Sequence, residues 1–455
     1  MHYISTRNNK IKESFLNILF QGLSKDGGLF LPSSWPLVSI ESIKRKTYQE
    51  IAYTVISPYV NNDISDDELI LILDKTYKNF HHESVAHLVN IEKNKYILEL
   101  FYGPTFAFKD YALQFLGNLF SHILLKSNKK ITVLGATSGD TGSAAIDAFK
   151  GKKDINVFIL HPHKMVSEVQ RRQMTTVTDS NIHNIALEGT FDDCQKIVKK
   201  LFLDVKLQAK TSLTAVNSIN WVRIIAQTVY YFWAYAQLDL EKINFIVPSG
   251  NFGNIFSARV AKYMGLPIDQ LYLVTNSNDI LHRTIKSGNM KTTNVQQTYS
   301  PSMDIQVSSN FERQIFECLG RNSDELQHVM KSFSNTGRHI LSSEVVKNLQ
   351  IIYKSYSVSD TQILEVINNF KNKYNYLADP HTATGLHVLE KEHCDNPLIS
   401  LACAHPAKFS EVIKKATGSK PDLPEKLRNV FDKEERFTIL QNNIEDIKEH
   451  ILINL

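Results

Sequence analysis

The chain has 455 residues, of which 43% are hydrophobic and 22% charged, a composition that is typical of a globular protein and excludes a disordered chain. Lys and Arg number 51 against 47 Asp and Glu, too small an excess to indicate a nucleic-acid partner. The sequence lacks the run of about 18 apolar residues that spans a membrane and the apolar segment of a secretory signal. The spacing of its four cysteines fits neither a zinc site nor a disulfide framework, so we expect a reduced, cytoplasmic protein of two or three domains.

The N-terminal part of the chain and the rest differ in their pattern of apolar residues. Segments 14–23, 47–60 and 66–77 repeat apolar residues with a helical period, which predicts a helical N-terminal module. From about residue 96, predicted strands and helices alternate as far as the strand 398–402. Alternation of this kind predicts α/β architecture, with parallel sheets that have helices on both faces and bind ligands at the carboxyl ends of their strands.

Glycine is scarce and clustered. Five of the 18 glycines fall in GATSGDTGSAA (135–145) and PSGNFGN (248–254). Each window joins a predicted strand to a predicted helix, an arrangement in which free amides at the helix N-terminus bind anions. A single such loop is as often purely structural, but two of them predict two anion-binding loops in one site. Neither window matches the nucleotide motifs GxxxxGK[ST] or GxGxxG.

Lys109 lies between two phenylalanines and a long apolar predicted helix, 111–125. Apolar surroundings desolvate a lysine and lower its pKa, which leaves a neutral amine for Schiff-base chemistry. The more common alternative for a lysine taken alone is a side chain that reaches from a helix end to water. A lysine nucleophile together with an anion-binding loop is the minimal set of groups that holds pyridoxal phosphate.

The predicted helix 220–235 is apolar on nearly every side, and its polar residues Asn220, Arg223 and Gln227 form one stripe. The stripe faces either a wet cavity or a narrow edge of solvent, and the sequence leaves both open. Asn217 and Ser218, just before this helix, either cap it or bind substrate.

Three further clusters carry polar or metal-binding side chains. Residues 379–382 and 405–408 are typical of loops when each is taken alone. His82 and His87 are five residues apart, which on a helix turns the two rings away from each other. We therefore predict no metal site.

Six motifs, FYGPTFAFKD (101–110), ATSGDTG (136–142), NSINWVRIIAQ (217–227), PSGNFGN (248–254), DPHTATG (379–385) and AHPAKF (404–409), occur in the order seen in threonine synthases. The stretch QGLSKDGGLFLP (21–32) is similar to the start of the longer, bacterial- and fungal-type branch of that family. The resemblance implies a fold-type II pyridoxal-phosphate enzyme, similar to the tryptophan synthase β subunit, with two parallel-sheet α/β domains. It also implies the following division: a helical N-terminal module (1–95), a smaller α/β domain with the lysine and the SGDTG loop (96–215), a larger α/β domain with the phosphate loop (216–420), and a peripheral C-terminal tail (421–455).

The resemblance assigns a role to each candidate residue. It implies that Lys109 forms the Schiff base with pyridoxal 5'-phosphate and is the catalytic base. The loop around the cofactor phosphate is then Gly250, Asn251, Phe252, Gly253 and Asn254. The loop that holds the substrate carboxylate is Thr137, Ser138, Gly139, Asp140 and Thr141. Candidates for the substrate phosphate are Arg223, Lys408, Asn217 and Ser218.

Two positions depart from the pattern of the family. Asp140 stands where related enzymes often have Asn near the phenolic oxygen of the cofactor, and an acid there would alter the distribution of protons on the ring. Cys403 replaces the threonine whose hydroxyl meets the pyridine nitrogen, and a thiol is a weaker hydrogen-bonding partner.

The implied reaction is the last step of threonine biosynthesis, in which O-phospho-L-homoserine and water give L-threonine and phosphate. Three alternatives remain. The first is a threonine-synthase-like phospho-lyase that yields 2-oxobutyrate, and the second is a catalytically silent binding protein with the same fold. The third, a nucleotide-binding regulator, lacks the expected motif ending. The sequence leaves the oligomeric state open.

Overall fold

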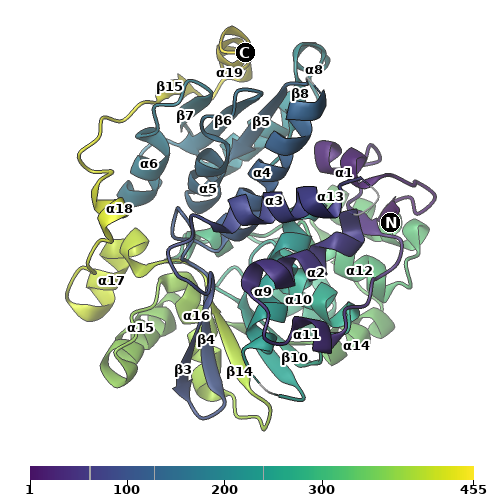
Figure 1. Cartoon of the computed structure of the whole chain (residues 1–455), viewed down its shortest axis with the longest axis vertical. Helices are drawn as coiled ribbons and strands as arrows, with labels where there is room; N and C mark the ends of the chain where they lie inside the picture. Colours follow the sequence, from purple (N-terminus) through teal and green to yellow (C-terminus); the bar gives the residue numbers. More distant parts are fainter. Residues whose placement is uncertain (61–62, 128, 239) are drawn as a thin grey trace.

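The computed structural model describes residues 1–60, 63–127, 129–238 and 240–455. Two largely parallel sheets, each surrounded by helices, form its two main layers (Figure 1). The six-stranded sheet has the order β13 (Tyr353–Ser357), β10 (Ile268–Thr275), β9 (Ile243–Pro248), β14 (Leu398–Ala402), β4 (Lys95–Glu99), β3 (His87–Glu92). The five-stranded sheet has the order β15 (Thr438–Gln441), β7 (Ile182–Glu188), β6 (Ile155–Pro162), β5 (Ile131–Ala136), β8 (Ser212–Thr214). The predicted α/β class is confirmed.

Strand direction is uniform apart from one edge. All pairs in the five-stranded sheet are parallel, and in the six-stranded sheet only β3 runs antiparallel to its neighbour, β4. Parallel strands that are covered on both faces are apolar along their whole length, as in β9, whose six residues are all buried. The carboxyl ends of β4, β5, β9 and β14 each lead into a motif that the sequence singles out.

Helix α9 (Trp221–Ala236) lies at the centre of the molecule. It packs against α2 (Tyr48–Val60), α4 (Lys109–Ser127) and α10 (Gly253–Tyr263), and its residues from 221 to 235 are all buried. Contact with helices on several sides explains an apolar sequence without a polar face. The polar stripe on this helix therefore faces the interior and not solvent.

The other helices lie around the two sheets. Those near the five-stranded sheet are α5 (Asp140–Phe149), α6 (Glu168–Thr175), α7 (Phe191–Phe202), α8 (Val205–Lys210) and α19 (Ile444–Ile453). Those near the six-stranded sheet are α11 (Ile280–Ser287), α12 (Phe311–Cys318), α13 (Ser323–Thr336), α14 (Ser343–Ile352), α15 (Asp360–Tyr374), α16 (Pro380–Lys391) and α17 (Ser410–Thr417). Short elements complete the chain: α18 (Glu425–Arg428), the hairpin β11 (Asn289–Lys291) with β12 (Arg338–Ile340), and the 3-10 helices Pro301–Met303 and Pro406–Phe409.

The N-terminal module contains the three predicted helices, α1 (Phe15–Gln21), α2 and α3 (Asp66–Tyr77). A reciprocal cap between Ser65 and Glu68 begins α3. Residues 1–77 of the module also contain a 3-10 helix, Ile40–Ile43, and two strands, β1 (Tyr3–Ser5) and β2 (Phe30–Pro32), which pair antiparallel. The helical period does not reveal these strands because each has only three residues.

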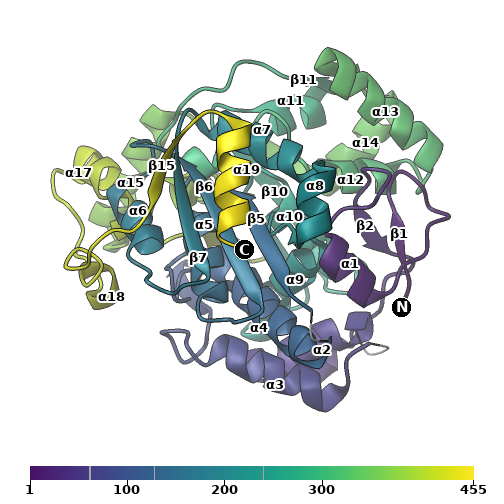
Figure 2. The ribbon, with the colours of Figure 1, turned by 90° about the horizontal axis from the view of Figure 1, so that it is seen from above.

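The sheets divide the chain differently from the predicted segments. Strand β4 begins at the predicted boundary, and its residues 96–99 were assigned to the smaller domain, yet it pairs with β14 in the six-stranded sheet. The segment 421–455 is not a peripheral tail, because β15 extends the five-stranded sheet beside β7 and α19 lies across that sheet (Figure 2). Ile447 and Ile451 of α19 are fully buried in the same apolar cluster as α7, so charged residues mark only its exposed face.

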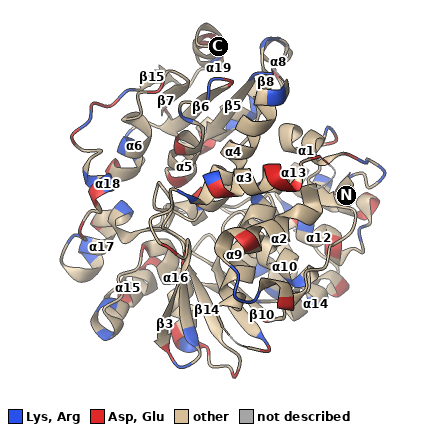
Figure 3. Ribbon diagram, viewed as in Figure 1, with Lys and Arg blue, Asp and Glu red and all other residues tan. Residues whose placement is uncertain are grey.

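In the view of Figure 3, acidic and basic residues are interspersed along the ribbon. Among the residues that the structure describes, no helix is both long and apolar enough to cross a membrane.

Candidate active site

Lys109 begins α4 at the end of a loop that follows β4. Its side chain is only 11% exposed, so it does not reach out to bulk water. The amine lies 3.5 Å from Asp140 Oδ2 and 3.5 Å from Ser302 Oγ. Burial lowers the pKa of Lys109; Asp140 opposes this effect, and the cations of Lys408 and Arg223 add to it. The apolar context in the sequence predicts this shift, and its consequence is a larger fraction of neutral amine.

The loop before Lys109 is held on two sides. Asp110 is fully buried and accepts hydrogen bonds from the Thr105 amide (2.8 Å) and hydroxyl (2.6 Å). The Phe108 amide donates to the Cys403 carbonyl at 2.8 Å. A Cβ on Gly103 would lie 2.3 Å from the Cβ of Asp110, so only glycine fits there. These contacts fix the point from which the lysine side chain leaves the backbone.

The turn 249–254 joins β9 to α10. Ser308 Oγ donates to the Gly250 carbonyl at 2.8 Å, and Asn310 Nδ2 donates to the Asn251 carbonyl at 3.0 Å. Phe252 has a left-handed backbone, with φ of 61°. No hydrogen bond among the described residues uses the amides of 250–253. The carbonyls are thus occupied while the amides are left for an anion.

Two side chains of this turn have buried polar atoms without a partner. They are Ser249 Oγ and Asn254 Nδ2. The amide oxygen of Asn254 accepts hydrogen bonds from the hydroxyls of Tyr230 and Tyr231 on α9, which fixes the orientation of its free Nδ2. Buried donors are rarely left unsatisfied, so this turn has the hydrogen-bonding capacity that a phosphate group requires.

The second glycine loop follows β5. Thr137 Oγ1 accepts from the amides of Gly139 (2.9 Å) and Gly142 (2.8 Å). Gly139 has φ of 142°, and a Cβ there would lie 2.5 Å from the Gln170 side chain. Thr137 and Gly139 therefore shape the loop, whereas Ser138 and Thr141 are half-buried beside them.

Asp140 and Lys408 form a buried ion pair. Lys408 is fully buried, and its amine lies 2.8 Å from Asp140 Oδ1 and donates to the Thr105 carbonyl at 2.8 Å. Gln170 Nε2 donates to the same carboxylate oxygen at 2.8 Å. Burial by itself raises the pKa of Asp140, but the cations of Lys408 and Lys109 outweigh it and hold the pKa well below its usual range. Asp140 is therefore a carboxylate that compensates two lysines.

Arg223 on α9 differs from Lys408 because the structure gives it no acidic partner among the described residues. Its Nη1 donates to the Val216 carbonyl at 2.9 Å, and its buried Nε has no partner. Burial lowers its pKa to about 10. A buried guanidinium with unused donors is a ready partner for an anion.

The cap of α9 is Asn220, whose side chain accepts from the Val222 amide at 3.0 Å. This excludes the capping alternative for Asn217 and Ser218. Asn217 is exposed, and the Ser218 hydroxyl accepts from Asn310 Nδ2 at 3.2 Å. Ser218 therefore lies beside the turn 249–254.

Cys403 directly follows β14 and is buried. Its amide donates to Thr382 Oγ1 at 2.8 Å, and the acceptor nearest its thiol, the Leu401 carbonyl, is 4.0 Å away. Burial raises the pKa of Cys403 well above its ordinary value, so the thiol is neutral. Its position next to the loop of Lys109 comes from the bond between Phe108 and Cys403.

Three residues of the site escaped sequence reasoning: Asp379, His381 and Ser302. Asp379 Oδ1 lies 2.8 Å from His381 Nδ1, and His381 Nε2 accepts from the Ser302 amide at 3.1 Å. The carboxylate also accepts from the Ala404 amide at 3.2 Å. This chain of contacts connects the segment after β14 to the Ser302 hydroxyl that faces Lys109. The sequence DPHT at 379–382 could have pointed to Asp379 and His381, but no local sequence pattern marks Ser302.

His82 and His87 have ring centroids only 4.5 Å apart. The prediction from sequence placed both histidines on a helix, where a spacing of five residues would turn the rings apart. That prediction does not apply, because the segment before β3 is a turn and not a helix. No third His, Cys, Asp or Glu joins them to make a metal-binding group in the part of the chain that the structure describes.

Comparison with known proteins agrees with this geometry. The models "Threonine synthase N terminus", "Pyridoxal-phosphate dependent enzyme" and "Threonine synthase, C-terminal" match residues 2–77, 84–332 and 382–451. The chain is 44% identical to a threonine synthase of Pseudomonas aeruginosa, over 99% of this chain and 98% of the other. A crystal structure of a pyridoxal-phosphate-bound threonine synthase from Brucella melitensis has a TM-score of 0.96 and 41% identity, covering 100% of this chain and 99% of that one. The yeast enzyme has a TM-score of 0.94 and 37% identity, with 100% and 98% covered. The chain therefore belongs to the threonine synthase family of pyridoxal-phosphate-dependent enzymes.

Proposed function

We propose that this protein converts O-phospho-L-homoserine and water into L-threonine and phosphate, with pyridoxal 5'-phosphate held at Lys109. One observation carries the proposal: a buried lysine amine and an anion-binding turn lie on either side of Ser302. The Ser302 hydroxyl is 3.5 Å from Lys109 Nζ, and its carbonyl is 3.0 Å from the place of a Cβ on Gly250.

The residues present fit this cofactor. The free amides of 250–253 and the unpaired donors of Ser249 and Asn254 match the oxygens of its phosphate. Any side chain at Gly250 would press on Ser302 and Met303, so the backbone can approach the ligand only if this residue is glycine. When bound, pyridoxal phosphate withdraws electrons and so stabilises negative charge at the α-carbon of the substrate.

Lys109 holds the cofactor and, once its amine is released, moves the proton at the α-carbon of the substrate. The lowered pKa of Lys109 provides the neutral amine that accepts a proton. Asp140 limits this shift and keeps Lys408 compensated. The pair of Asp379 and His381 orients Ser302 against the amine.

We assign the substrate phosphate to Arg223, with Ser218 and Asn217 beside it, because Arg223 is a buried cation that has no acidic partner among the described residues and whose Nε donor is unused. Lys408 is a weaker candidate since Asp140 and Thr105 already engage its amine. For the substrate carboxylate we propose Ser138, Thr141 and the amides of the loop 137–141. Thr137 and Gly139 act by shaping that loop, and the negative charge of Asp140 excludes direct contact with a carboxylate. We place the neutral Cys403 thiol against the pyridine nitrogen.

The test is incubation of the purified holoenzyme with O-phospho-L-homoserine while phosphate and L-threonine are measured. We expect the two products in equal amounts. Lys109→Ala should abolish both products and the visible absorbance of the lysine-bound cofactor.

The phospho-lyase and the silent binding protein would each give a different result. Phosphate released with 2-oxobutyrate and no threonine would identify a phospho-lyase. A protein that gains no visible absorbance with pyridoxal phosphate would be a silent member of the fold.

A further inference from the structure

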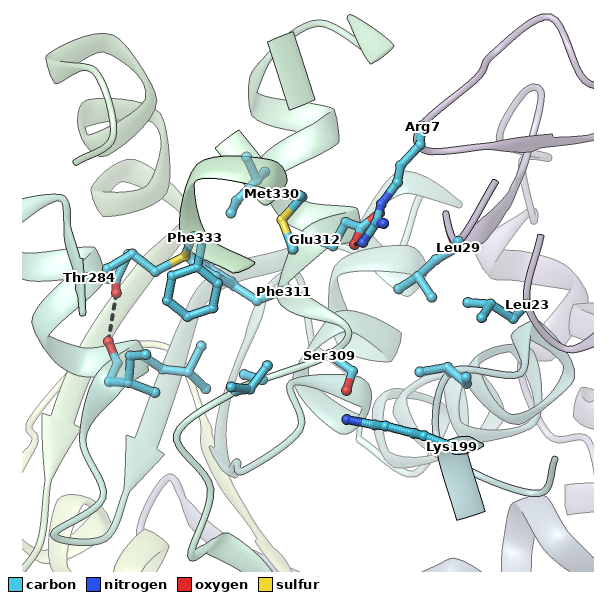
Figure 4. Close-up of a pocket in the computed structure, with 18 residues that line it drawn as sticks. Arg7, Leu23, Leu29, Lys199, Thr284, Ser309, Phe311, Glu312, Met330 and Phe333 are labelled. Carbon is cyan, nitrogen blue, oxygen red and sulfur yellow. Dashed lines mark hydrogen bonds and ion pairs between the residues drawn. The ribbon is translucent and has the colours of Figure 1, made fainter. Parts of the chain in front are cut away.

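A cavity of about 270 Å³ lies where the N-terminal module, α7 and the segment from α11 to α13 meet (Figure 4). Its lining shares no residue with the loops 137–141 and 249–254, and Lys109 is not part of it. The volume is close to the lower end of the range for small-molecule sites, about 300–1,000 Å³. Most of the wall is apolar and includes Leu29, Ile280, Phe311, Met330 and Phe333.

Three charged residues line this cavity, and two of them neutralise each other. Arg7 donates to both carboxylate oxygens of Glu312, at 3.0 Å and 2.8 Å. Thr6 Oγ1 also donates to this carboxylate at 2.7 Å. Glu312 is 4% exposed, so its acceptors are used and screened from water.

The third charged residue, Lys199 of α7, is exposed and stands at the mouth of the cavity. It has no hydrogen bond or ion pair with any residue that the structure describes. Figure 4 shows its amine directed into the cavity beside Ser309. One end of an apolar cavity therefore has one uncompensated positive charge and one hydroxyl. An anionic group at this end gains a charge-assisted hydrogen bond, and a cationic group is repelled.

We propose that this cavity is a second ligand site, which binds a small amphiphile made of an apolar body and one carboxylate. The carboxylate lies against Lys199 and Ser309, and the apolar body packs on Phe311, Met330 and Phe333. Of the described residues that line the cavity, Lys199 is the one cation without an acidic partner, so a second negative charge on the ligand would gain no partner and we expect a monoanion. The proposal concerns a site apart from Lys109 and does not depend on the reaction assigned above.

The ligand would touch three parts of the chain that are distant in sequence: the N-terminal module, α7 of the five-stranded sheet and α12 beside the six-stranded sheet. A ligand that binds only this folded arrangement stabilises it by mass action. Binding therefore raises the temperature of thermal unfolding, which gives a readout that is independent of catalysis.

The probe is 3-phenylpropionate, with the neutral 3-phenylpropanamide as its uncharged analogue, added to the holoenzyme. We expect saturable binding of the carboxylate by calorimetry, a rise in Tm, and about 10-fold weaker binding of the amide. Lys199→Gln should weaken binding of the carboxylate about 3- to 10-fold, and Ser309→Phe should abolish it by filling the cavity. Lys200→Gln is the matched control, because Lys200 is the next residue on α7 and is exposed like Lys199, but does not line the cavity.

Three results would overturn the proposal. The first is the absence of saturable binding up to about 10 mM, a concentration at which even weak sites are detected. The second is equal binding of the two probes, or equal binding of the carboxylate by wild type and both cavity variants. The third is displacement of the probe by O-phospho-L-homoserine, which would place the probe at Lys109 instead. Circular dichroism and turnover of each variant establish that it is folded.

Discussion

Asp110, the neighbour of Lys109, is a fully buried carboxyl group that holds the loop before the lysine. Burial raises its pKa from 3.8 to about 7, although hydrogen bonds from Thr105 oppose the shift. Because the folded pKa is the higher one, its contribution to stability is complete below about pH 4 and is lost as the pH rises through 7. The difference between these two pKa values corresponds to about 4 kcal/mol of stability.

The measurement is the free energy of unfolding of wild type and Asp110→Asn by denaturant between about pH 4 and 7. Loss of hydration lowers the pKa values of buried His161 and half-buried His405 to about 4. The stability that these two histidines contribute is lost in the opposite direction, as the pH falls. The difference between the two proteins cancels these histidines. We expect the advantage of wild type to shrink by up to about 4 kcal/mol as the pH rises, and a constant difference would contradict the assignment.

Arg223 offers a second test at a single residue. Arg223→Gln should raise the KM for O-phospho-L-homoserine about 10-fold or more, since a hydrogen bond to a charged group contributes about 1.5–3 kcal/mol. The visible absorbance of the cofactor should stay unchanged, and Arg223→Lys should be intermediate. Initial rates over a range of substrate concentrations give KM and kcat separately. An unchanged KM in both variants would remove Arg223 from the phosphate site.

Single residues of the site differ in how far sequence reveals them. Lys109 and the turn 249–254 stand out because a lysine among apolar residues and clustered glycines are locally unusual. Ser302 is an ordinary serine in a short 3-10 helix, and it reaches the amine through contacts with residues distant in sequence, such as that of its amide with His381. The engagement of Lys408 with Asp140 is likewise a contact between distant residues that no local pattern contains.

Among the elements, α4 carries the lysine at its first turn and packs closely against α5. Gly117 of α4 is where the two helices meet: a Cβ there would lie 2.5 Å from the Ala148 carbonyl oxygen. Backbone cannot move aside as a flexible side chain can, so any larger residue separates the helices. The close approach fixes the direction of α4 and therefore the position of the Lys109 amine.

Gly117→Ala should cost about 1–3 kcal/mol through overpacking, whereas the higher helix propensity of alanine should return about 1 kcal/mol. We therefore expect a net loss of stability. The readout is denaturant unfolding, together with turnover by the holoenzyme, which should fall as the lysine shifts. Leu125→Ala on the same helix is the control, because Leu125 is 73% exposed and its loss should change stability by less than about 0.5 kcal/mol. A stabilised Gly117→Ala would show that the helices have room to adjust.

Element types were predictable where the apolar period is strong, as in α7 and β6, whereas pairing was not. Strand β4 lies next to β14, about 300 residues later in the chain, and the sequence of β4 alone does not say which sheet it joins. The choice is made by the helices and strands that cover it. This is why the predicted boundary at residue 96 and the sheets disagree.

At the scale of the whole molecule, the chain begins the five-stranded sheet at β5, leaves it after β8, and returns at its C-terminus with β15 and α19. Strand β15 covers the edge of β7, and α19 covers an apolar cluster beside the five-stranded sheet. Uncovered strand edges and apolar clusters promote aggregation. The last segment is therefore part of the domain that also contains the loop 137–141.

Substitutions of two isoleucines on α19 test whether this helix is part of the domain or a peripheral tail. Ile451 is fully buried, whereas Ile453, two residues later on the same helix, is 75% exposed. Ile451→Ala should lower the free energy of unfolding by about 2–5 kcal/mol, while Ile453→Ala should change it by less than about 0.5 kcal/mol. Denaturant unfolding with a probe of the five-stranded sheet, such as hydrogen exchange at the β7 amides, measures both. Truncating an isoleucine in a packed helix leaves a cavity and lowers the free energy of unfolding. Equally small effects of the two substitutions would therefore mean that α19 does not pack against the sheet.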